Sequence, residues 1–203
     1  MRADAQAVQA VVVPARQPER DVLPLFVQRW SPRAFRPEPV PRAVLESMVE
    51  AARWAPSSIN LQPWRFHITT TGATRRLWDS AVGERNRTWS DQAGALVWVV
   101  ARTAFGPNPF HPPETPNRHA LFDTGMAAIQ FVLEGERRGV RSHFLGGVDY
   151  QAAREMLGLA PDEEVVCAIV VGYPADPAAL PEPLRLREAP SGRKPAAEIS
   201  RFA

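Results

Sequence analysis

Two arginines flank a serine in the stretch Arg29-Trp30-Ser31-Pro32-Arg33, just after a short predicted helix. Two guanidinium groups and a hydroxyl can neutralise a phosphate monoester and bind it through bidentate hydrogen bonds. Solvated loop arginines are the more ordinary interpretation of such a pair. The stretch by itself therefore raises a phosphate site only as a hypothesis.

Polar side chains also fill the connection between a predicted helix and a predicted strand, from Pro56 to Pro63. Ser57, Ser58, Asn60 and Gln62 offer both hydrogen-bond donors and acceptors there. Such a set can bind the edge of a flat heterocycle. The alternative is a turn whose side chains satisfy the free backbone carbonyls at the end of the helix. The stretch alone favours neither interpretation.

Several common catalytic patterns are absent from the sequence. It contains neither G-x-G-x-x-G after a strand nor G-x-x-x-x-G-K-[ST], the two frequent phosphate-binding loops, and no G-x-S-x-G. The four histidines show no metal-ligand spacing, so we predict no metal site. No nucleophile is paired with a base. If the protein is an enzyme, we therefore expect an organic cofactor to supply the chemistry.

Composition narrows the class of protein. The chain has 203 residues, 45% of them apolar, and a net charge of +2, which fits one globular domain without a dedicated nucleic-acid surface. No run approaches the ~20 apolar residues of a transmembrane helix, so no membrane partner is expected. The single cysteine, Cys167, lies in an apolar run, where we expect inert packing. One unpaired thiol suits a reducing, cytoplasmic location.

The hydrophobic pattern predicts an α+β domain with a central mixed or antiparallel sheet. We expect residues 1–20 to form a mobile N-terminal arm and residues 21–203 to form a single domain. Its proline-rich tail, from about 174 to 203, should be extended chain. Helices are predicted at 21–28, 41–54, 73–82, 119–138 and 149–157, strands at 64–71, 95–101, 142–145 and 165–173, and a long loop at 103–118.

Taken together, the two polar stretches closely resemble the N-terminal signature of the FMN-dependent nitroreductase family. They read Arg29-x-Ser-x-Arg33-x-Phe and then Ala-Arg-Trp-Ala-Pro-Ser-Ser-x-Asn-x-Gln-Pro-Trp-Arg-Phe, with a helix between them. The resemblance runs from about residue 22 to 200. It continues through Asn86-Arg-Thr-Trp, Phe122-Asp-Thr-Gly, Phe144-Leu-Gly-Gly-Val-Asp, Gly172-Tyr-Pro-Ala and Gly192-Arg-Lys-Pro.

The resemblance implies a three-layer fold, an intertwined homodimer and two FMN sites shared between subunits. It places the 29–33 stretch at the phosphate and ribityl end of FMN and Asn86 at the flavin pyrimidine ring. The backbone of the glycine pair would pass near flavin N5, and the 56–60 loop would reach the flavin from the other subunit. The implied cofactor-binding residues are Arg29, Trp30, Ser31, Arg33, Pro56, Ser57, Ser58, Asn60, Asn86, Gly146, Gly147 and Arg193.

The sequence departs from the family pattern at two positions. Trp89 stands where many members carry Lys or Arg, a cation that would stabilise negative charge on reduced flavin. Gly146 stands where some members have an acidic residue. Trp89 and Phe110 are candidates for stacking on substrate, with core or loop packing as the alternative for each. The 103–118 loop is the candidate for shaping substrate choice.

The expected activity is a ping-pong reaction in which NADH or NADPH reduces FMN. The flavin then reduces a nitroaromatic, a quinone or a similar small acceptor. No catalytic side chain is expected, because the reaction takes place at flavin N5. Two alternatives remain open: an FMN-dependent oxidase or dehydrogenase that introduces a double bond into a small natural product or peptide-derived substrate, and a non-catalytic flavin-binding or scaffold subunit.

Overall fold

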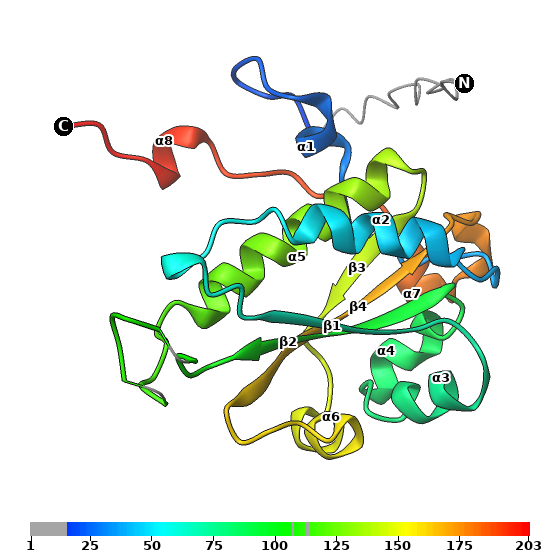
Figure 1. Cartoon of the computed structure of the whole chain (residues 1–203). Helices are drawn as coiled ribbons and strands as arrows, with labels where there is room; N and C mark the ends of the chain where they lie inside the picture. The colour runs from blue at the N-terminus through cyan, green and yellow to red at the C-terminus, as the bar shows by residue number, and fades with distance from the viewer. Residues whose placement is uncertain (1–15, 107, 113) are drawn as a thin grey trace, which may run out of the picture.

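A four-stranded antiparallel sheet forms the centre of the computed structural model, which describes residues 16–106, 108–112 and 114–203. The strands are β1 (Trp64–Thr69), β2 (Ala95–Arg102), β3 (Arg141–Leu145) and β4 (Glu163–Gly172), in the spatial order β1-β2-β4-β3 (Figure 1). Residues 96–101 of β2 are completely buried because helices cover both faces of the sheet. The predicted α+β class with a central antiparallel sheet is confirmed.

Two long helices cover one face of the sheet. They are α2 (Arg42–Ala52) and α5 (Ala120–Arg137), and their apolar sides meet β2 and β4 around Met48, Phe131 and Val97. At Gly135 an added Cβ would lie 2.7 Å from the Met48 Cε atom. The absence of a side chain there lets the two helices pack closely.

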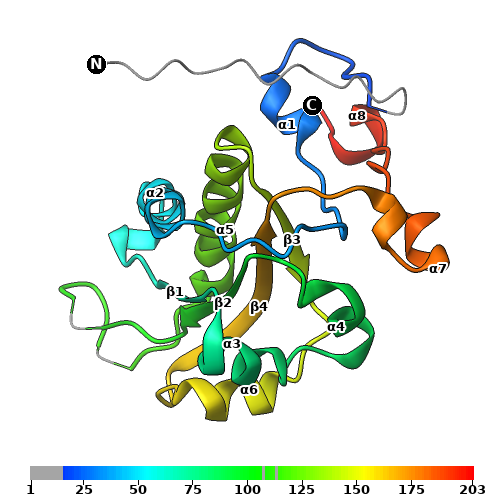
Figure 2. The ribbon, with the colours of Figure 1, turned by 90° about the vertical axis from the view of Figure 1, so that its right-hand side faces the viewer.

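Shorter helices cover the other face, which gives the three layers visible in Figure 2. They are α3 (Gly72–Asp79), α4 (Glu84–Ser90) and α6 (Tyr150–Leu157), packed over Trp98, Val170 and Leu96. Asp149 caps α6: its Oδ1 accepts a hydrogen bond from Ala152 N at 2.9 Å. Gly158 ends the helix with a φ of 63°.

The N-terminal segment and the C-terminal tail lie together beside this core. They contain α1 (Pro24–Gln28), then η2 (Pro177–Ala179), α7 (Glu182–Arg185) and α8 (Ala196–Ile199). The tail predicted as extended chain therefore includes short helices. Of the predicted mobile arm, residues 1–15 lie outside the described residues. Among the helices that are described, none is both long and apolar enough to span a lipid bilayer.

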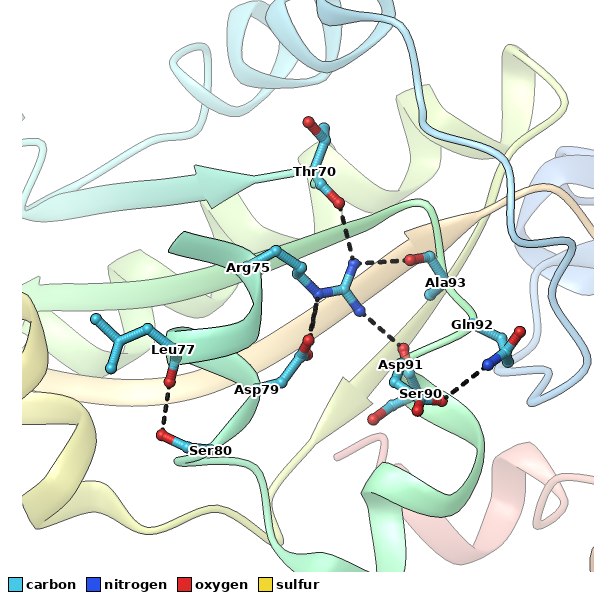
Figure 3. A network of polar contacts seen from close by, with 9 residues as sticks. All are labelled: Thr70, Arg75, Leu77, Asp79, Ser80, Ser90, Asp91, Gln92 and Ala93. Carbon is cyan, nitrogen blue, oxygen red and sulfur yellow. Dashed lines mark hydrogen bonds and ion pairs between the residues drawn. The ribbon is translucent and has the colours of Figure 1, made fainter. Parts of the chain in front are cut away.

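Arg75 ties α3 to the segment between α4 and β2 (Figure 3). Its side chain is 6% exposed. Its Nε contacts both carboxylate oxygens of Asp79, at 2.9 and 3.0 Å, while its Nη atoms donate to Ala93 O at 2.7 Å and Ser90 O at 3.0 Å. Because Ser90 ends α4, this network fixes the helix that carries Asn86 and Trp89.

We expect Arg75→Met to lower the free energy of unfolding by about 3 kcal/mol, because it leaves Asp79 and two carbonyls without their partner. Arg42→Ala is the matched control. Arg42 also pairs with a carboxylate four residues on, Glu46, but the two side chains are 91% and 60% exposed, so little stability should be lost. Equal losses in urea unfolding would contradict a structural role for the Arg75 network.

Candidate functional site

Three arginines from distant parts of the chain meet beside α1. Arg16 donates through Nη1 to the carbonyls of Val27 and Arg29, at 2.9 and 2.5 Å, and through Nε to Ser191 O in the tail, at 2.8 Å. Arg29 Nη1 lies 3.4 Å from the Ser31 hydroxyl. Burial lowers the pKa of Arg29, the Glu136 carboxylate opposes that shift, and the charge of Arg193 adds to it. We call Arg16, Arg29 and Arg193 the α1 cluster.

Glu136 is a buried carboxylate that faces the α1 cluster from the end of α5. It is 4% exposed, and its Oε2 accepts a hydrogen bond from Arg141 Nη1 at 2.5 Å. Burial raises its pKa to about 7, while the charges of Arg141, Arg29 and Arg16 act in the opposite direction. Its Oε1 has no hydrogen-bond partner among the described residues. Because this pKa is close to 7, Glu136 is only partly ionised at pH 7 and compensates the positive charge of the α1 cluster only in part.

His143 on β3 fixes the backbone of the 31–33 stretch. Its Nδ1 lies 2.8 Å from Pro32 O, and because a carbonyl only accepts, Nδ1 carries the proton. The imidazole ring packs against the Trp89 ring, with centroids 4.6 Å apart. Burial, the largest influence, and the charges of Arg33 and Arg29 together lower the pKa of His143 to about 4, while the hydrogen bond to Pro32 O acts in the opposite direction. His143 is thus neutral at pH 7.

On the other side of this stretch, Arg33, Asn86 and Gly147 line one cavity of about 730 Å³. Asn86 Nδ2 donates to Gly147 O at 3.1 Å, and Gly83 N donates to the same oxygen at 2.9 Å. A Cβ on Gly147 would lie 2.8 Å from Asn86 Nδ2, so only glycine allows this approach. The Arg33 guanidinium lies 5.8 Å from the centre of the Trp89 ring.

The loop from Pro56 to Asn60 lies elsewhere in the single chain. Both ribbon views place the segment after α2 on the other side of the molecule from α4 (Figures 1 and 2). The loop is held by Asp123, whose Oδ2 accepts from Ser58 N at 3.0 Å. Ile59, Asn60 and Gln62 have φ values of 42°, 58° and 49°, which non-glycine residues rarely adopt. One chain does not unite this loop with Asn86, and its contribution from a second subunit stays a prediction.

The remaining predicted residues differ in exposure. Trp89 is 3% exposed and packed against His143 and Phe35, which favours the packing alternative for it. Phe110 is 70% exposed in the long loop. Trp30 is half-buried beside the α1 cluster. Gly146 accepts hydrogen bonds at its carbonyl from Val148 N and the Tyr150 hydroxyl, at 3.1 and 3.3 Å.

Cys167 packs in β4, and burial raises the pKa of its thiol to about 12. This agrees with the expected inert role. Sequence reasoning missed four charged residues near the site: Arg16, Arg85, Glu136 and Arg187. They belong to no recognisable motif, and only the folded chain brings them to the predicted residues.

Comparison with known proteins shows a consistent set of relatives. The model of the Nitroreductase family matches residues 26–88 and 79–173. A crystal structure described as an oxidoreductase containing FMN has a TM-score of 0.89 and 33% identity, covering 96% of this chain and 99% of that one. An NADH dehydrogenase of Thermus thermophilus is 28% identical over 189 residues, covering 80% of this chain and 91% of the relative.

A second curated relative is the CLA biosynthesis enone reductase of Lactiplantibacillus plantarum. It is 25% identical over 187 residues, covering 76% of this chain and 86% of the relative. The similarity thus extends along most of both chains and spans proteins with different named activities.

The lowered pKa of the partly buried His143 predicts a specific pH dependence of stability. In the unfolded chain the pKa of an imidazole is about 6.5. Because its folded-state pKa is about 4, the unfolded chain gains a proton first as the pH falls, and the contribution of His143 to stability decreases between those values. The stability of the wild type relative to His143→Asn should decrease by about 2–3 kcal/mol from pH 7 to pH 4.

The difference between the two proteins isolates His143, because Glu136 is present in both. Its raised pKa acts in the opposite sense, removing stability as the pH rises from about 4.5 to about 7. Urea unfolding at a series of pH values measures the difference. A difference that does not change with pH would show that His143 titrates normally.

Proposed function

Because the chain belongs to the nitroreductase family, we propose that it carries electrons from NADH or NADPH, through bound FMN, to a small acceptor in a ping-pong reaction. The observation that carries the proposal is the cavity shared by Arg33, Asn86 and Gly147, with the α1 cluster beside it. The arginines suit the anionic phosphate end of FMN, and the amide of Asn86 suits the polar edge of its ring system.

The donor set fits FMN at both ends. The α1 cluster and the Ser31 hydroxyl offer positive charge and hydrogen bonds to a phosphate dianion. This charge is available because Glu136 compensates it only in part. Asn86 presents an amide, able to donate and to accept, to the edge of a pyrimidine ring. Gly147, free of a side chain, leaves the backbone accessible beside it.

The protein contributes binding and electrostatics. FMN, when bound, supplies the hydride-accepting and hydride-donating N5 atom. Position 89 carries Trp where many family members have Lys or Arg. The Arg33 guanidinium lies over the Trp89 ring and lines the same cavity as Asn86, so it places a cation in that region. We therefore propose that Arg33 lies at the pyrimidine end, and not at the phosphate and ribityl end that the family resemblance implies for it, and that it replaces the missing charge there.

We also propose that residues 21–203 act as one FMN-binding domain and that two chains form each site. The strained 56–60 loop lies away from Asn86 in the single chain, and α5 exposes Leu121, Phe122 and Ile129 at 47%, 70% and 38%. A second chain packed on this face would cover apolar surface and bring in a loop that is already folded. A cytoplasmic location is proposed on the single cysteine.

The relatives support the reductive direction. The named activities include an enone reductase at 25% identity and, over shorter matches, nitroreductases such as the chloronitrobenzene nitroreductase of Comamonas testosteroni, at 33% identity over 89 residues. Nitro groups, quinones and enones share an electron-poor conjugated system. We propose acceptors of this chemical kind.

The direct experiment mixes FMN-loaded protein with NADH or NADPH under anaerobic conditions. The yellow absorbance of the flavin should bleach within seconds and return when a quinone or a nitroarene is added. Free FMN at the same concentration is the control. If neither nucleotide bleaches the bound flavin, the reductase proposal is wrong, and bleaching by an oxidisable substrate instead would support the oxidase or dehydrogenase alternative.

A further inference from the structure

A second set of arginines lines the cavity that holds Asn86. Arg33 reaches it from the loop after α1, Arg85 from α4, and Arg187 from the segment after α7. We call these three residues the α4 cluster. They come from separate parts of the chain, so the fold, and no local motif, brings their charges together.

The guanidinium groups of Arg187 and Arg85 are close enough to act on that of Arg33. Burial lowers the pKa of Arg33 most, the charge of Arg187 lowers it further, Glu188 opposes this, and Arg85 adds to the lowering. Among the described residues, Arg85 and Arg187 have no ion pair and no hydrogen bond from their side chains. Positive charge at this cavity is therefore available to a ligand.

The carboxylates nearby neutralise the cluster only in part. Glu188 Oε1 accepts from the backbone N–H groups of Arg33 and Ala34, at 2.7 and 2.8 Å, and Oε2 lies 3.8 Å from Arg33 Nη1. Asp149 lines the cavity while it caps α6, and it offsets part of the positive charge without forming an ion pair with Arg85 or Arg187 in the described chain. Glu84 is the remaining acidic residue at the cavity, and it forms no ion pair with the described residues.

The cavity also has apolar walls, formed by Trp89 and Leu184 beside the amide of Asn86. A ligand that fits this lining combines a flat or apolar part with an anionic group. Planar oxyanions suit arginine well, because two N–H groups can bind two oxygens in parallel.

We propose that Arg85 and Arg187 of the α4 cluster bind an oxyanion of the second substrate, either the extra phosphate that distinguishes NADPH from NADH or the carboxylate of an acidic acceptor. The inference rests on the proposed function. In that proposal the α1 cluster holds the FMN phosphate and Asn86 marks the ring end of the flavin. The α4 cluster surrounds the ring end, so its anion belongs to another molecule.

The test uses the double variant Arg85→Gln/Arg187→Gln and compares matched ligands on the purified full-length protein. Titrations measure the dissociation constants of NADP⁺ against NAD⁺, of benzoate against benzamide, and of FMN. Arg76→Gln is the control, since Arg76 is an exposed arginine on α3 outside this cavity. Arg29→Ala/Arg193→Ala is the reference for losing the FMN phosphate contact.

We expect the double Gln variant to weaken binding of one anionic ligand about tenfold or more, as loss of charge-assisted hydrogen bonds does, while its neutral or less charged partner is unaffected. Loss for NADP⁺ alone identifies the nucleotide phosphate, and loss for benzoate alone identifies an acidic acceptor. FMN affinity should stay at the wild-type value, and Arg85→Lys/Arg187→Lys should keep most of the anion preference.

Unchanged preferences in the Gln variant would overturn the proposal. A fall in FMN affinity as large as that of Arg29→Ala/Arg193→Ala would also overturn it, since the cluster would then hold the FMN phosphate. Failure of the proposed function is separately visible, because a wild type that binds no FMN can still be titrated with NADP⁺ and benzoate.

Discussion

Positive charge held in a fixed backbone is the constraint on which the site depends. The 31–34 stretch is bound on one side by His143, through Pro32 O, and on the other by Glu188, through the N–H groups of Arg33 and Ala34. Arg16 likewise binds the carbonyl of Arg29, so the backbone keeps both Arg29 and Arg33 close to their cationic neighbours. A bound anion would relieve part of the repulsion between these cations, which is a physical reason for a ligand at this place.

The layered fold supplies each partner in this arrangement. Strand β3 carries His143 and Arg141, the end of α5 carries Glu136, and the tail carries Glu188 and Arg193. On the opposite face of the sheet, the buried Arg75 fixes α4 and so the position of Asn86 (Figure 3). The sheet therefore holds the α1 cluster and α4 in fixed positions, where we propose that the phosphate end and the ring end of FMN lie.

Sequence reasoning predicted the elements that have strong local patterns. The apolar runs that predict β2 and β4 are local features, and both strands are confirmed. Helix α4 was missed because its sequence, ERNRTWS, shows no apolar periodicity. The positive φ of Ile59 has no sequence signal either, since a β-branched residue disfavours that conformation. The pairing of Arg33 with Glu188 spans 155 residues, beyond any local pattern.

The central claim is that each flavin site is complete only when two chains meet, because the 56–60 loop and the Asn86 cavity lie apart in one chain. Sedimentation velocity, followed at the flavin absorbance during serial dilution, tests it most directly. FMN should sediment with the dimer and be released as the dimer dissociates. A monomer that sediments with tightly bound FMN would contradict the shared site.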